Sequence, residues 1–436
     1  MGLTRDPCRF ERFRFERFGQ GWAWWLFALV LLLAPQVLDS HFGISMLSQM
    51  GIAILACLSY NFLFGQGGML SFGHAVYTGL GSYAAIHALL RAADGGVMIP
   101  VSLIPLVGGL AGLLVAALFG WVMTRKAGTA FAMITLGFGE LVFALALMFP
   151  DWFGGEAGIS ANRVVGEPFF GITWGPSVQV YYLIAVYTYV GVAAMFALTR
   201  TPLGRILNAV RDNPERVEFI GYDVRAVRYW AMMVAGFFAG VSGGLAAILF
   251  EIVTPEVLGS LRSGAYLLFT VLGGSTFFFG PILGGVLMVL ALVFLSELTQ
   301  AWMLYLGLIF VFMMMHAPGG LASVIMANLR VAAHGRWREL WGGYLALGGT
   351  GLAALAGASA MIEMLYHLQH EAALGPHVEV FGLLLDPRSA QHWIGAAWVL
   401  ATGAALFELA RRRLRAHWNE IQLDIEKETQ RRERAA

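Results

Sequence analysis

The segment from Arg200 to Arg228 has the sequence RTPLGRILNAVRDNPERVEFIGYDVRAVR and separates two apolar blocks, residues 178–199 and 228–250. Each block has roughly the 20 apolar residues that a helix needs to cross the hydrocarbon core of a bilayer. The segment between them is too polar to cross a bilayer and much longer than a tight turn. This pattern predicts two membrane-spanning helices joined by a polar loop with structure of its own.

The composition of the whole chain also indicates a membrane protein. The chain has 436 residues, of which 58% are hydrophobic and 13% charged, whereas soluble domains have about 25% charged residues. Its net charge of +1 gives no reason to expect nucleic acid as a partner. Cys8 and Cys57 lie in a basic arm and an apolar block, so no disulfide or cysteine metal site is expected. The first apolar block ends in a poor cleavage sequence, which favours an uncleaved helix over a signal peptide.

Hydropathy predicts an all-α polytopic membrane protein with about 12 transmembrane helices, a core of about ten and a C-terminal pair. The expected spans are 22–38, 45–63, 68–90, 99–123, 129–149, 178–199, 228–250, 263–279, 281–297, 302–315, 342–365 and 392–410. The expected domains are a basic and aromatic arm (1–21), a core (22–330) that contains the polar loop 200–228, an added helix pair (331–410) and an amphipathic tail (411–436). The arm is expected either to lie at lipid headgroups or to be a disordered tail. The tail is expected to lie on the membrane surface or to pack on a partner, because one of its faces is apolar.

The positive charges predict the orientation of the chain. Cytoplasmic loops of membrane proteins carry an excess of Lys and Arg. With twelve helices, every arginine-rich segment falls on one side, and both termini are therefore expected in the cytoplasm. These segments contain Arg5 to Arg17, Arg125 with Lys126, Arg200 to Arg228, Arg330 to Arg338, and Arg411 to Arg415.

The polar loop itself has features of two short amphipathic helices. Ile206, Ala209 and Val210 have near-helical spacing, as do Val217, Ile220 and Gly221. Pro214 can open the second helix, since proline is tolerated in a first turn, and Gly221 can end it. Two such helices on the cytoplasmic side predict a docking surface for a soluble partner. The residues alone leave an ordinary surface loop as an equal alternative.

Several stretches resemble the LivM-type permease subunits of branched-chain amino-acid ABC importers. They are YNFLFGQGGMLSFGHA (60–75), TLGFGE (135–140), GGEAGI (154–159), residues 204–221, and FFAGVSGGL (237–245). They occur in the expected order and separations. The sequence APGGL (317–321) resembles the usual end of such a subunit. The resemblance covers roughly residues 40–330 and says nothing about the residues beyond.

The resemblance implies the permease subunit of an importer for branched-chain amino acids or similar small polar solutes, in a bacterial inner membrane. Such a subunit works by alternating access with a second related permease, two cytoplasmic ATPase subunits and a periplasmic solute-binding protein. Membrane lipid is the expected partner of its spanning helices. The residues expected to couple to the ATPases are Gly204, Arg205, Arg211, Asp212, Asn213, Arg216 and Gly221. Neither Lys126 nor Lys427 is followed by Ser or Thr, so the chain has no P-loop. ATP is therefore expected on the partner subunits, and no cofactor is expected in this chain.

Candidates for the translocation path are few, because ionisable and polar groups are rare in the apolar blocks. They are Gly67, Gly68, Ser71, His74 and Glu140. The glycines predict either close helix packing, which is the favoured interpretation, or a broken helix at 65–73. A charge at Glu140 would cost roughly 2.5–3.5 kcal/mol in a bilayer, so a hydrogen bond to a neighbouring helix is favoured over a place on the path. His74 is expected to bond between helices more readily than to a solute.

Two other classes of protein remain as alternatives. An ATP-independent secondary transporter or channel usually has several intramembrane carboxylates or unwound helices. Glu140 alone is little evidence for a protein of this class. A membrane enzyme would need a catalytic cluster, and none is evident. No metal site is expected, because the histidines of the loop 366–392 match no ligand spacing.

Overall fold

A computed structural model describes residues 20–95, 99–164, 173–334, 336–371, 378–380 and 382–435. Residues 1–19 of the expected basic arm lie outside this part of the chain. The chain divides into two compact units. Unit 1 comprises residues 1–295 and 312–322, and unit 2 comprises residues 296–311 and 323–436. The domain boundary expected at residue 330 stays a prediction.

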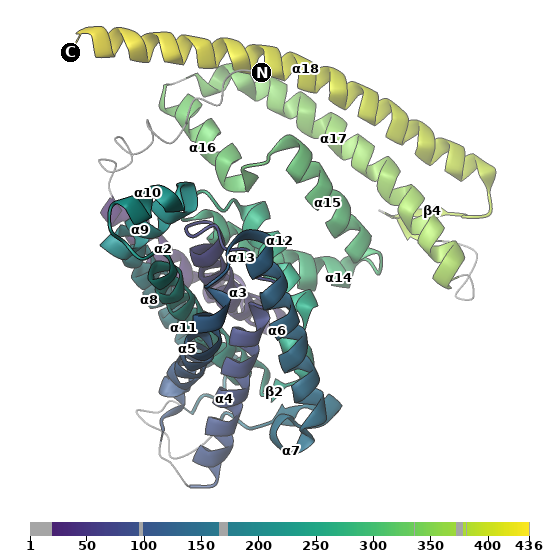
Figure 1. Cartoon of the computed structure of the whole chain (residues 1–436). Helices are drawn as coiled ribbons and strands as arrows, with labels where there is room; N and C mark the ends of the chain where they lie inside the picture. The colour runs from purple at the N-terminus through teal and green to yellow at the C-terminus, as the bar shows by residue number, and fades with distance from the viewer. Residues whose placement is uncertain are drawn as a thin grey trace. The chain divides into compact units, whose positions relative to one another are not determined.

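Unit 1 is a bundle of helices (Figure 1). Its helices are α2 (Gln20–Val37), α3 (His41–Phe64), α4 (Ala75–Ala93), η1 (Val101–Leu103), α5 (Ile104–Met123), α6 (Gly128–Met148), α7 (Pro150–Phe153), η2 (Gly155–Ala157), α8 (Ser177–Arg200), α9 (Pro202–Asp212), α10 (Pro214–Phe219), α11 (Val224–Phe250), η3 (Pro255–Leu258), α12 (Ser260–Gly273), α13 (Gly280–Val289) and the π-helical turn η4 (Leu290–Phe294). Strands β1 (Ile159–Ser160) and β2 (Ile252–Val253) pair antiparallel.

Unit 2 is built mainly on two long helices. Its elements are α17 (Trp337–Tyr366), the π-helical turn η5 (His367–Glu371), the antiparallel strands β3 (Val378–Val380) and β4 (Leu383–Leu385), and α18 (Ala390–Ala435). Three helices have residues in both units: α14 (Leu295–Leu298), α15 (Trp302–His316) and α16 (Gly320–Ala333). The close approach of α17 and α18 is possible because Gly357 and Gly403 have no side chains to separate the two backbones.

The all-α polytopic architecture is confirmed, whereas the count of twelve spans is not. Among the described residues, eight helices are long and apolar enough to cross a membrane, or nine if α15 and α16 together form one bent span. The predicted spans 22–38, 68–90 and 263–279 correspond to the shorter or less apolar helices α2, α4 and α12. Hydropathy counted apolar residues that belong to non-helical backbone, as at residues 68–74.

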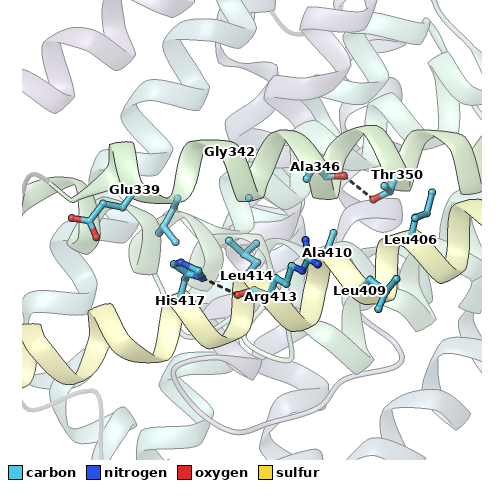
Figure 2. A pocket seen from close by; sticks show the side chains of 12 residues that line it. Glu339, Gly342, Ala346, Thr350, Leu406, Leu409, Ala410, Arg413, Leu414 and His417 are labelled. Carbon is cyan, nitrogen blue, oxygen red and sulfur yellow. Dashed lines mark hydrogen bonds between the residues drawn. The ribbon is translucent and has the colours of Figure 1, made fainter.

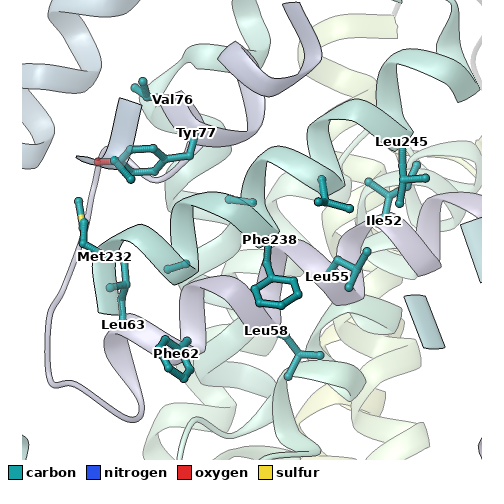
Figure 3. Close-up of a cluster of buried hydrophobic side chains, with 14 of the residues drawn as sticks. Ile52, Leu55, Leu58, Phe62, Leu63, Val76, Tyr77, Met232, Phe238 and Leu245 are labelled. Carbon is teal, nitrogen blue, oxygen red and sulfur yellow. The ribbon is translucent and has the colours of Figure 1, made fainter. Parts of the chain in front are cut away.

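The core of unit 1 lies where α3, α4, α5 and α11 meet. Figure 3 shows its apolar side chains, among them Leu55, Leu58 and Phe238. Three glycines, Gly81, Gly108 and Gly240, bring α4, α5 and α11 so close that a Cβ atom on any of them would collide with a neighbouring backbone. Small residues that permit close helix approach are typical of membrane bundles. Close helix packing, the interpretation favoured for glycines in the apolar blocks, is therefore observed where α4, α5 and α11 meet.

The predicted tail is a direct continuation of α18, not a separate surface helix. Of its apolar stripe, Leu414, Trp418 and Ile421 pack against Val331 and Leu340 within unit 2. This packing occupies the face that was expected to meet a membrane surface or a partner.

Candidate functional site at the α9–α10 segment and the interrupted helix

The polar loop forms two short helices, as predicted. Pro202 opens α9 and Pro214 opens α10, each at a position where the missing N–H costs no helical hydrogen bond. The Oγ1 atom of Thr201 accepts from the N–H of Gly204 (3.5 Å), and Oδ1 of Asn213 accepts from the N–H of Arg216 (3.0 Å). These two caps explain why the helices start where they do.

Gly221 ends α10, as predicted. Its φ of +96° is one that a residue with a side chain rarely adopts. Its N–H donates to the carbonyl of Glu218 (2.9 Å), and the chain then turns into α11, whose first N–H groups donate to Asp223. The direction in which α11 leaves α10 therefore depends on the glycine.

The exposed side of these two helices combines charges with large apolar groups. Leu207, Val210 and Val217 are buried, and the other side faces outward. We call this surface the docking face; it consists of Arg205, Asp212, Asn213, Arg216, Phe219, Ile220 and Tyr222. Phe219 is 91% exposed and Ile220 70%. Val217 and Ile220, which the sequence grouped by their near-helical spacing, therefore differ: Val217 is buried and Ile220 is exposed. The exposure of Phe219 could not be predicted from that spacing.

The inner side of α9 is bonded to the end of α3. The Nδ2 atom of Asn208 donates to Oε1 of Gln66 (2.7 Å), and the guanidinium of Arg211 donates to the carbonyl of Gly65. We call these two hydrogen bonds the α9 contact. Arg211 also bonds to its neighbour Asp212 (3.0 and 3.1 Å), so it belongs to both sides of α9. Sequence reasoning missed Gln66 and Asn208, because nothing in their spacing connects positions so far apart.

Residues 65–74 interrupt the helix that was expected at 68–90. The backbone leaves the helical conformation after Phe64 and resumes it at Ala75, with Gly68 at φ +65° beneath the side chain of Arg211. Residues 65–74 thus form a non-helical connection between α3 and α4, and α4 starts at Ala75 instead of at residue 68. Farther along, the N–H of Phe72 donates to Thr135 of α6 (3.1 Å), and Gly73 packs against the backbone there. Non-helical backbone at membrane depth is tolerated where protein surrounds it.

The interruption ends at a buried histidine. His74 has no exposed surface, and its Nε2 is 2.9 Å from Oγ of Ser59. The rings of Tyr60, Tyr77 and Tyr266 stand edge-on to the imidazole, with centroids 5.2, 5.9 and 6.3 Å away. Among the described residues, neither its Nδ1 nor the buried Oγ of Ser71 has a hydrogen-bond partner. The expected bond between helices exists at Nε2, and the other nitrogen remains available.

Glu140 lies on the outward side of α6 and is exposed. It makes no hydrogen bond or ion pair with the described residues, so the expected bond to a neighbouring helix is not formed within this chain. The sequence alone could not show which side of α6 meets the bundle. In the structure that side carries Phe138, Gly139 and Val142.

The described residues offer no other evident site. They contain no group of three or more His, Cys, Asp or Glu side chains that could hold a metal ion. Unit 2 has an open groove of about 430 Å³ between α17 and α18 (Figure 2). Leucines line one part of the groove, and Glu339, Arg413 and His417 line another. These residues lie beyond the stretches that resemble permeases.

The fold and this site define the class of the protein, a multi-pass membrane permease. A family model described as "branched-chain amino acid transport system / permease component" matches residues 42–317, and the chain belongs to this family. It is 30% identical to the high-affinity branched-chain amino acid transport system permease protein LivM of Salmonella typhimurium and of Escherichia coli, over 70% of this chain and 75% of each relative. No solved structure matches it. The chain is accordingly the permease subunit of an ABC importer.

Proposed function

We propose that this permease imports branched-chain amino acids or similar small polar solutes, and that one of two ATPase subunits in the complex binds its docking face. The proposal rests on Phe219 and Ile220, which are exposed beside Arg216 at the end of α10. The start of this helix is fixed by the Asn213 cap. Exposed aromatic and aliphatic groups next to arginines are typical of the centres of protein interfaces. The relatives named for branched-chain amino acid transport support the choice of solute.

The α9 contact gives the proposed ATPases a mechanical route into the membrane domain. A movement of α9 would be passed directly to Gly65 and Gln66, because two hydrogen bonds join them. From there the non-helical segment leads to His74. ATP would be bound only by the partner subunits, and its binding and hydrolysis would drive alternating access. This chain would hold no cofactor itself.

Glu140 supports the presence of a second, related permease. A carboxylate facing lipid near the middle of a span costs roughly 2.5–3.5 kcal/mol on insertion scales. The exposed side of α6 around it also carries Gly137, which has open space where a side chain would be. A second permease that covers this side, with the solute path between the two chains, would remove the carboxylate from lipid. A periplasmic binding protein would deliver the solute.

Purification tests the proposed partners. When a tagged chain is isolated from its native membranes in mild detergent, we expect ATPase subunits and a second permease to accompany it, and the complex to hydrolyse ATP. An ATP-independent secondary transporter, the alternative class, would be isolated without an ATPase and would still move solute in ATP-free vesicles. That second result would contradict the proposal.

The proposed orientation places both termini and the docking face in the cytoplasm. In a chain without Cys8 and Cys57, we expect Ser160→Cys to react with an impermeant thiol reagent in intact cells, because Ser160 is exposed in the opposite loop. Glu215→Cys, on the exposed side of α10, is expected to react only after the membrane is opened. Reaction at position 215 in intact cells would refute the orientation.

A further inference from the structure

Two helices of unit 1 begin in the middle of the bundle rather than at an end. Ser242 of α11 donates to the carbonyl of Ile52, halfway along α3 (3.0 Å), and the next residue, Gly243, packs against Thr78 in the first turn of α4. Helix α4 therefore starts at about the mid-height of α3. Helix α12 starts at the same height, because Oγ of Ser263 in its first turn accepts from the N–H of Ala75 (2.9 Å).

The two helices leave this meeting point in opposite directions. Helix α12 runs toward the Phe64 end of α3, since Thr270 bonds to the carbonyl of Cys57 (3.3 Å) and Ser275 lies against Gly65. With 14 residues, α12 has a length of about 21 Å and covers only part of a bilayer. Both N-termini therefore converge at membrane mid-depth.

Each of these N-termini carries a partial positive charge, because the peptide dipoles of a helix are aligned. The first three N–H groups of α4 are already bonded, to Oγ of Ser263 and to the carbonyls of Gly73 and His74. The N-cap residues His74 and Gly259 make no side-chain capping bond. The first turn of α12 also contains Arg262, a full positive charge. Among the described residues Arg262 has no carboxylate partner; its Nε makes a long hydrogen bond (3.4 Å) to the hydroxyl of Tyr266. An arginine at this depth without a counterion lacks the usual compensation for its charge.

Unused hydrogen-bonding groups lie beside the same point. Within the part of the chain that the structure describes, Nδ1 of His74 and Oγ of Ser71 have no hydrogen-bond partner, although both residues are fully buried. Tyr266, which bonds to Arg262, is also one of the three tyrosines around His74. Buried polar atoms without partners are uncommon in native proteins, and each requires an explanation. A ligand that binds in another conformation would provide one for both atoms.

We propose that the paired N-termini of α4 and α12, with Arg262, Ser71 and His74, form a binding subsite for the carboxylate of the transported solute. The inference rests on the proposed function and adds to it the chemical class of the solute. Arg262 and the dipoles of the two helices supply positive charge, and Nδ1 of His74 and Oγ of Ser71 supply hydrogen-bonding positions. The subsite therefore favours amino acids and other carboxylates over neutral amides and urea. Arg262 is partly exposed, whereas Ser71 and His74 are buried, so the solute reaches these two when residues 65–74 or α6 move.

The test measures the electrostatic potential at Ser71 with two thiol reagents of solute size. Ser71→Cys is introduced into a chain without Cys8 and Cys57, and the full complex in membrane vesicles is treated with a sulfonate and with a trimethylammonium methanethiosulfonate, with and without ATP. We expect the anionic reagent to react at least about tenfold faster than the cationic one, relative to their rates with a free thiol. Arg262→Gln should abolish this preference, and Arg262→Lys should keep most of it.

A matched control is Ser48→Cys on α3, an equally buried serine whose hydroxyl bonds to the carbonyl of Ile44. It should react with neither reagent. Equal normalised rates at position 71, no reaction there under any condition, or a preference that survives Arg262→Gln would each overturn the proposal. If Arg262 were only structural, Arg262→Gln would change both rates alike. An isolated complex without ATPase subunits would instead count against the proposed function, whereas the ratio of the two labelling rates at position 71 tests the subsite.

Discussion

Replacement of Phe219 and Ile220 by aspartate is expected to separate the chain from its ATPase partners. These two side chains are among the most exposed large apolar groups of unit 1. Central apolar residues of an interface often contribute 2 kcal/mol or more each, so a double variant is expected to weaken binding by roughly a hundredfold or more. Co-purification of the ATPase with the tagged permease measures this, and ATP hydrolysis by the isolated complex should be lost with it.

The control for this prediction is Phe149→Asp, because Phe149 is also exposed. It follows the last residue of α6, whereas the arginine-rich loop with Arg125 and Lys126 precedes the first residue, Gly128. That variant should retain its ATPase. The double variant itself should insert normally, because neither residue belongs to the buried core. If the ATPase remains bound at wild-type stoichiometry when both positions are aspartate, the docking face has been assigned to the wrong surface.

Disruption of the α9 contact is expected to separate ATP hydrolysis from transport. Gln66→Ala and Asn208→Ala each remove one partner of a single partly buried hydrogen bond. The docking face remains intact, so the ATPase should stay bound and active. Uptake in reconstituted vesicles should nevertheless fall about five- to tenfold, because, of the two hydrogen bonds of the α9 contact, only that of Arg211 then remains. Two assays on one preparation, ATP hydrolysis and solute uptake, distinguish this result from a general loss of folding.

The double variant provides the sharper test, because residues in direct contact are not independent. If the 2.7 Å bond carries the coupling, Gln66→Ala with Asn208→Ala should be little worse than either single change. Asn162→Ala, the same substitution on an exposed loop, should leave both assays unchanged. Additive losses, or uptake at the wild-type level in the double variant, would show that motion reaches the membrane domain by another route.

Local features of the sequence were sufficient for the parts of this protein that depend on near neighbours. The polar loop 200–228 is short of apolar residues, so it could not be a span, and its prolines and Gly221 set the limits of α9 and α10 through backbone restrictions that act within a few residues. The family could be recognised for the same reason, since its motifs are local. The membrane class followed from composition, because a bilayer demands apolar blocks of fixed length.

The tertiary structure decided which side chains meet and which remain unpaired. The bond between Gln66 and Asn208, the exposure of Phe219 and Glu140, and the meeting of α4 with α12 all depend on how helices distant in the chain pack. Hydropathy counted residues 68–74 and 263–279 as parts of full spans, because apolar composition does not distinguish a helix from non-helical backbone buried by its neighbours. The sequence by itself thus determined a helical permease with a structured polar loop. Only packing decided that the loop is bonded to an interrupted helix, and that a second half-length helix begins where the interruption ends.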